Sequence, residues 1–188
     1  MNEEKKTLKT EDAVIEAIYA SRGRILQLAI ETETLMDIFI AYYFTDDEFK
    51  IDEFISTILV PHISFGKKKE LFQYTMEKSG LLEEGQIKKT MEVIKVIVEE
   101  RNIFAHWPLD FSEEALYVYE QLRIVTLKKM KIKRLNGQLQ YYDTKPYSDK
   151  SINAQIKICQ EMNDFIKGLI KFKDEESLRR KTGKPATP

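Results

Sequence analysis

The sequence contains one stretch, residues 84–106, that reads EGQIKKTMEVIKVIVEERNIFAH and has the spacing of an amphipathic helix. Its apolar side chains recur in steps of four, three and four residues, at Ile87, Met91, Ile94 and Val98. Such steps place side chains on one face of an α-helix. Pro108 ends the pattern, because a proline restricts the residue before it to extended conformations. The stretch therefore predicts a long helix that buries one face.

Helical periodicity continues on both sides of this stretch. It predicts four further helices, at residues 10–44, 49–59, 67–78 and 149–172. The first is either continuous or broken near Ser21–Gly23, the second stops before Pro61, and Gly80 ends the third. These patterns indicate a protein built mainly from helices.

Residues 116–143 have a different pattern, rich in Tyr, Val, Ile and Leu. The pair Asn136–Gly137 favours the tight turn of a β-hairpin, with arms near 123–135 and 138–143. We therefore expect a mainly α fold, a bundle of about five helices with an inserted β-hairpin at about 116–143. It forms a single domain over residues 1–172, and the polar residues 173–188 form a flexible C-terminal tail.

Composition narrows the function classes. One cysteine and two histidines argue against a structural zinc site, and the sequence lacks phosphate-binding loops and other metal motifs. We expect no metal and no other cofactor. The charged N-terminus and the absence of an apolar run long enough for a membrane span predict a cytoplasmic protein without a membrane partner. Cys159 lies on an apolar helix face and is predicted to be a buried thiol.

The net charge of −1 hides a strong asymmetry along the chain. Residues 1–60 carry six basic and 13 acidic side chains, whereas residues 123–188 carry 16 basic and seven acidic ones. Phosphate binding depends on local positive potential and not on the total charge. The C-terminal third could therefore contact nucleic acid.

The end of the helix at 84–106 carries an unusual polar group. At 100° per residue, Arg101 falls on the apolar stripe and is predicted to be buried, with Asn102, His106 and Trp107 beside it. A buried guanidinium must be paired or functional.

These residues resemble the signature of the HEPN superfamily, which has an Arg, a polar residue directly after it, and a His four to six positions further on. Here Arg101, Asn102 and His106 fit that pattern, with four residues between the Arg and the His. The resemblance covers roughly residues 11–108 and 150–172 and leaves the hairpin out. It implies a metal-independent ribonuclease of a toxin, abortive-infection, antiviral-defence or RNA-processing system, although other members are non-catalytic partners.

The chemistry suits these residues. Cleavage of RNA by its own 2′-hydroxyl needs a base for that proton and a cation for the phosphorane charge. We assign His106 as the base and Arg101 as the phosphate-binding residue, while Asn102 orients the imidazole or binds the phosphate. In the alternative, Arg101 pairs with Glu31 or Glu33 and His106 only caps a helix end. Both can also hold, with the acids orienting Arg101 in a working site.

One Arg and one His make a sparse active site for a single chain. A two-fold axis brings the same residues together from two copies, and the family resemblance also implies dimers whose motifs face one cleft. We therefore expect a homodimeric endoribonuclease with an RNA substrate, restrained by an antitoxin or another regulatory protein. The alternative function is a non-catalytic helical interaction module, a partner subunit of a defence or toxin–antitoxin assembly.

The predicted hairpin is strongly basic. Lys129, Lys131 and Lys133 alternate with apolar residues along one strand, and three tyrosines follow, Tyr141, Tyr142 and Tyr147. Lysines interleaved with aromatic side chains can follow a phosphate backbone and stack on unpaired bases, which makes the three lysines candidate substrate-binding residues. Alternatively, they protect an edge strand from pairing with another chain.

Overall fold

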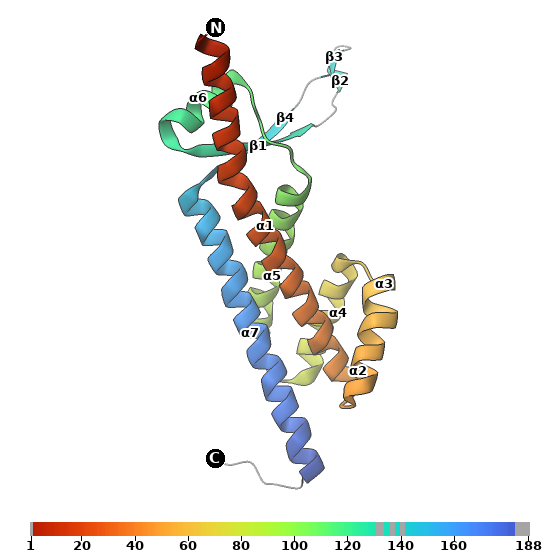
Figure 1. Cartoon of the computed structure of the whole chain (residues 1–188). Helices are drawn as coiled ribbons and strands as arrows, with labels where there is room; N and C mark the ends of the chain where they lie inside the picture. The colour runs from red at the N-terminus through yellow and green to blue at the C-terminus, as the bar shows by residue number, and fades with distance from the viewer. Residues whose placement is uncertain (1, 131–133, 136–137, 140–141, 183–188) are drawn as a thin grey trace. The chain divides into compact units, whose positions relative to one another are not determined.

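The structure is a computed structural model that describes residues 2–130, 134–135, 138–139 and 142–182. It is mainly helical with a small antiparallel hairpin, as the sequence predicts. Figure 1 traces the chain from its first helix to its last. The chain forms two compact units, each assembled from separate stretches of sequence. Unit 1 contains residues 1–27 and 98–157, and unit 2 contains residues 28–97 and 158–188. Three long helices, α1 (Asn2–Phe44), α5 (Glu84–His106) and α7 (Asp149–Thr182), contribute residues to both.

Unit 1 combines segments of the long helices with α6 (Glu113–Leu122), β1 (Ile124–Met130) and β4 (Tyr142–Ser148). The strands pair antiparallel from Ile124↔Ser148 to Met130↔Tyr142. Two shorter strands pair further along the hairpin, β2 (Arg134–Leu135) and β3 (Gln138–Leu139). The predicted turn at Asn136–Gly137 lies outside the described residues. The core of this unit includes Val14, Ile18, Phe104, Val125, Leu127, Tyr147 and Ile152.

Helix α6 was not expected, because the sequence pattern assigned residues from 116 onward to the hairpin. Ser112 caps α6 by accepting a hydrogen bond from the Ala115 N–H, and Glu113 and Glu114 occupy its first turn. Both features favour a helix start. The hairpin therefore begins at Ile124, after Arg123 closes α6 in a left-handed conformation with φ 54°.

Unit 2 contains α2 (Glu48–Phe54), η1 (Ile55–Leu59), α3 (Val60–His62) and α4 (Phe65–Ser79), together with its parts of the long helices. Its core includes Met36, Phe39, Ile40, Phe72, Met76, Ile94 and Ile166. Cys159 is buried, as predicted. The rings of Phe39 and Phe72 pack edge to face with centroids 5.2 Å apart, which joins α1 to α4.

Several predicted helix boundaries are wrong. Pro61 does not end the second helix, because η1 is a wider π-turn in which the Val60 N–H bonds to the Ile55 carbonyl. Such a turn admits a residue that has no N–H to donate. Helix α1 begins at Asn2 and is unbroken at Gly23. Helix α7 continues to Thr182, through most of the predicted tail. In the described part of the chain, no helix is long and apolar enough to cross a membrane.

Candidate functional site

The three motif residues lie on the last two turns of α5, within unit 1. Arg101 is half-buried, and Asn102 and His106 are exposed. The Arg101 guanidinium donates a hydrogen bond of 3.0 Å from Nη1 to Oδ1 of Asn102. His106 follows Asn102 by four residues, so both side chains lie on the same face of the helix. The helix thus presents a cation, an amide and an imidazole at the surface.

The predicted burial of Arg101 is wrong, because its side chain is only half-buried. At this end of α5 the buried ionisable residue is Glu100, which is 6% exposed. The buried face of α5 runs through Ile94, Ile97, Glu100 and Phe104. This face is turned by roughly 80° from the predicted stripe at 100° per residue. Arg101 and Ala105 therefore leave the core.

Glu100 is held by two residues of β4. The Tyr147 hydroxyl donates to its Oε2 at 2.7 Å, and Lys145 pairs with its Oε1. Burial raises the pKa of Tyr147 well above its ordinary value, and the hydrogen bond to Glu100 adds to this shift. Tyr147 is 3% exposed and cannot stack on a base, contrary to the predicted role of this tyrosine. These contacts fix the rotation of α5 at the residue before Arg101.

Trp107 anchors the other end of the motif. Its backbone N–H donates to the Ile103 carbonyl at 2.9 Å, and its backbone carbonyl accepts from Nη2 of Arg22 in α1. The Lys129 ammonium lies 5.8 Å from the centre of its indole ring. Sequence patterns gave no indication of Arg22, because nothing local to residue 22 relates it to residue 107.

The base of the hairpin is attached directly to the end of the motif helix. Leu109 forms an antiparallel bridge with Leu127, the Lys128 N–H donates to the Pro108 carbonyl, and the Asp110 N–H donates to the Thr126 carbonyl. Strand β1 is therefore paired on both sides at residues 126–128, and the edge-strand alternative for Lys129, Lys131 and Lys133 stays open. Lys129 comes next and is exposed. Lys131, Lys133 and Tyr141 lie outside the described residues.

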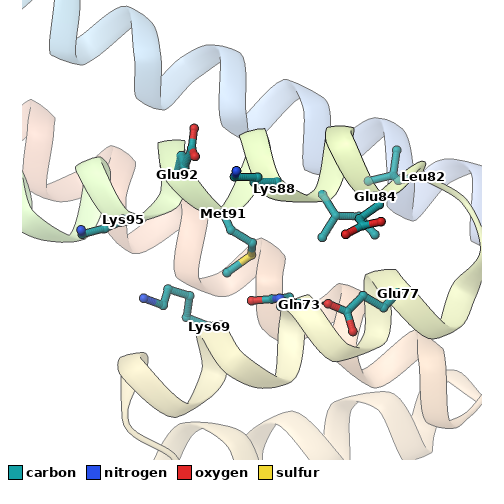
Figure 2. Close-up of a pocket in the computed structure, with 10 residues that line it drawn as sticks. Lys69, Gln73, Glu77, Leu82, Glu84, Lys88, Met91, Glu92 and Lys95 are labelled. Atoms are coloured by element: carbon teal, nitrogen blue, oxygen red, sulfur yellow. Dashed lines mark hydrogen bonds between the residues drawn. The ribbon is translucent and has the colours of Figure 1, made fainter.

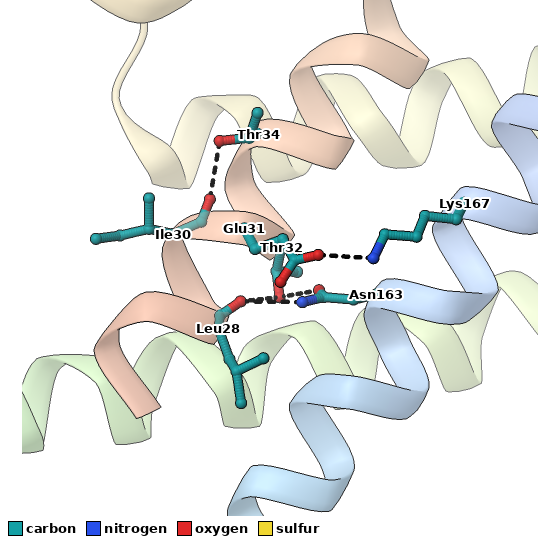
Figure 3. A network of polar contacts seen from close by, with 7 residues as sticks. All are labelled: Leu28, Ile30, Glu31, Thr32, Thr34, Asn163 and Lys167. Carbon is teal, nitrogen blue, oxygen red and sulfur yellow. Dashed lines mark hydrogen bonds and ion pairs between the residues drawn. The ribbon is translucent and has the colours of Figure 1, made fainter. Parts of the chain in front are cut away.

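The predicted supporting acids, Glu31 and Glu33, belong to unit 2 and pair with lysines of that unit. Figure 3 shows Glu31 on α1 facing Lys167 of α7, with 2.7 Å between carboxylate and ammonium. Beside this pair, the buried Thr32 hydroxyl bonds to the Asn163 side chain at 2.6 Å. Glu33 accepts from the Lys68 ammonium at 2.9 Å.

Lys68 is the centre of a buried charge cluster. Its ammonium donates to Asp37 at 2.7 Å, and these two residues are 3% and 2% exposed. Lys68 is thus buried, whereas Lys67 beside it is exposed. Burial raises the pKa of Asp37, although the hydrogen bond from Lys68 opposes that shift. Burial alone would lower the pKa of Lys68, but hydrogen bonds to Asp37 and Glu33 outweigh it and raise the value.

A separate groove of about 810 Å³ lies between α4 and α5 within unit 2. Leu82, Ile87 and Met91 form its apolar part. Figure 2 shows Lys69 and Lys95 toward one end and Glu77 and Glu84 toward the other, with Glu92 and Lys88 between them. The three motif residues do not line this groove.

No family model matches the chain, and no curated protein or solved structure shows detectable similarity to it.

Proposed function

We propose that this protein is a metal-independent endoribonuclease of a defence or toxin-type system that works as a homodimer. The observation that carries the proposal is the position of Arg101, Asn102 and His106 at the surface end of α5, where an RNA phosphate can reach them. Among the described residues, no carboxylate pairs with Arg101. Its charge therefore remains available for an anion.

In the proposed reaction, His106 takes the proton of a ribose 2′-hydroxyl. The freed 2′-oxygen attacks the adjacent phosphorus, and Arg101 stabilises the negative charge that develops on the phosphorane. The bond from phosphorus to the 5′-oxygen then breaks. That oxygen is protonated from solvent and His106 returns its proton to solvent, which leaves a 2′,3′-cyclic phosphate and a 5′-hydroxyl. Asn102 orients the Arg101 guanidinium, to which it is hydrogen-bonded.

The test is cleavage of labelled RNA by the purified protein in excess EDTA. We expect a cyclic phosphate product and no cleavage of DNA, which lacks the 2′-hydroxyl. His106→Ala is expected to lower the rate by about a hundred- to ten-thousand-fold, and Arg101→Ala by about a hundred- to thousand-fold. Neither side chain is buried, so both variants should fold.

His62→Ala is the matched control, because His62 is the other histidine of the chain and is also exposed. It should cut RNA as the wild type does. A folded wild type that cuts no RNA, or a His106→Ala protein with full activity, would exclude the enzyme.

The second candidate function is a non-catalytic helical interaction module, such as a partner subunit of a toxin–antitoxin assembly. The feature that favours it is the groove between α4 and α5, because an apolar groove edged by charged side chains suits an amphipathic partner helix. Loss of partner binding on reversal of Lys69 and Lys95 to Glu, without any RNA cleavage by the wild type, would support this alternative.

A further inference from the structure

A second half-buried guanidinium, that of Arg22, lies beside the motif. Its Nη2 donates to the Trp107 carbonyl, while its Nε is buried and lacks a hydrogen-bond partner in the described part of the chain. Burial lowers the pKa of Arg22. A charged donor that is partly dehydrated and only partly satisfied is stabilised by a nearby anion.

A second cation reaches the same tryptophan from the hairpin. Lys129 is exposed and its ammonium lies over the indole ring of Trp107. Two carboxylates of unit 1 are already engaged, since Glu100 pairs with Lys145 and Asp110 with Lys128. Among the residues that the structure describes, no acid pairs with either Arg22 or Lys129. Asp143 lies opposite Lys129 in the β1–β4 register and offsets part of this charge, so the positive potential at Trp107 depends on Arg22 and Lys129 together.

Trp107 directly follows the candidate base, His106. We propose that Arg22 and Lys129 form a binding site for a phosphate of single-stranded RNA, one that neighbours the cleaved phosphate. The inference rests on the proposed function for the identity of the anion. A single strand fits better than a duplex, because cations grouped around an aromatic side chain suit a flexible backbone whose bases are unpaired.

The experiment measures binding separately from cleavage, in a His106→Ala background. The probe is a fluorescently labelled single-stranded RNA of about 16 nucleotides, long enough for one such surface. Its affinity is followed by fluorescence anisotropy over a series of salt concentrations. For single strands, each phosphate contact contributes about 0.7 to the slope of log K against log salt concentration. Arg22→Gln and Lys129→Gln should each reduce the slope by about that amount, and together by about twice as much.

Arg24→Gln is the matched control, because Arg24 lies on the same helix, carries the same charge and is exposed. Its slope should equal that of the background protein. Lys129→Gln changes an exposed side chain, so it tests the site even if Arg22→Gln fails to fold.

The inference would be overturned if the Lys129→Gln protein and its background had equal slopes, or if Arg24→Gln reduced the slope as much as Arg22→Gln. It would also be overturned if the protein bound no RNA at all. If the slopes change as expected but the wild type never cuts RNA, the phosphate site stands and the nuclease proposal fails.

Discussion

At the scale of single residues, two neighbouring lysines differ sharply in burial. Lys68 is enclosed between Asp37 and Glu33, whereas Lys67 beside it is exposed and pairs with Glu70 on the surface. The cluster around Lys68 carries one positive and two negative groups. Removal of the ammonium would leave two carboxylates together, one of them fully buried.

Lys68→Met tests this cluster. Loss of one partner from a buried pair costs about 3–5 kcal/mol of unfolding free energy. Lys67→Met, the control at the adjacent exposed pair, should cost about 0–1 kcal/mol. Urea unfolding at neutral pH measures both, and equal costs would contradict the burial of Lys68.

The loss of unfolding free energy caused by Lys68→Met should be smaller at acidic pH. Asp37 has a raised pKa when folded, so the stability that its protonation contributes is complete below its unfolded pKa and is lost as the pH rises through the folded value. Loss of Lys68 removes an interaction that lowers this pKa, and the acid-dependent contribution grows. Unfolding at pH values from about 4 to 7 should therefore show a deficit that is largest at neutral pH. A deficit independent of pH would contradict this assignment.

Sequence periodicity predicts only part of which side chains are buried. It correctly placed Ile87, Ile94 and Cys159 in the core, because each repeats an apolar neighbour on its own helix. Arg101 was misplaced because the buried face of α5 turns toward Glu100, and that turn depends on Lys145 and Tyr147, some 45 residues away in sequence. Contacts of that range leave no local signal.

At the scale of elements, helix starts and ends were predictable where one residue sets the backbone. Gly80 ends α4 in the left-handed region with φ 66°, as expected. The bounds of α5 were also correct. Predictions failed where a wider context decides, as at Pro61, where a π-turn absorbs the proline.

Two glycine substitutions should shift stability in opposite directions. Gly80→Ala forces a side chain into the left-handed region and should cost about 1–2 kcal/mol. Gly23 lies inside α1 with open space around its Cβ position, so Gly23→Ala should stabilise by about 0.5–1 kcal/mol. Thermal or urea unfolding of the two variants measures both. Destabilisation by Gly23→Ala would indicate a break in α1 at that point.

At the scale of the whole molecule, one copy offers one Arg101 and one His106, on the same exposed helix end. The proposed reaction needs a base and a cation at the same phosphate, and an isologous interface that pairs two motif helices can bring His106 of one copy beside Arg101 of the other. If the residues of one site come from two chains, RNA cleavage requires the dimer. If they come from one chain, the monomer can cleave RNA as well.

Mixing two inactive variants tests this link. Arg101→Ala and His106→Ala homodimers should each be inactive, because every site lacks the cation or the base. A mixed dimer retains one Arg101 from one chain and one His106 from the other, so a shared cleft would regain partial activity after subunit exchange. Exchange is verified by co-purification of differently tagged chains, and a mixture of Arg101→Ala with an Arg101→Ala, His106→Ala double variant is the control that should stay inactive. If tagged mixed dimers form and still cut no RNA, both groups must act within one chain, and the two-fold site is not the catalytic unit.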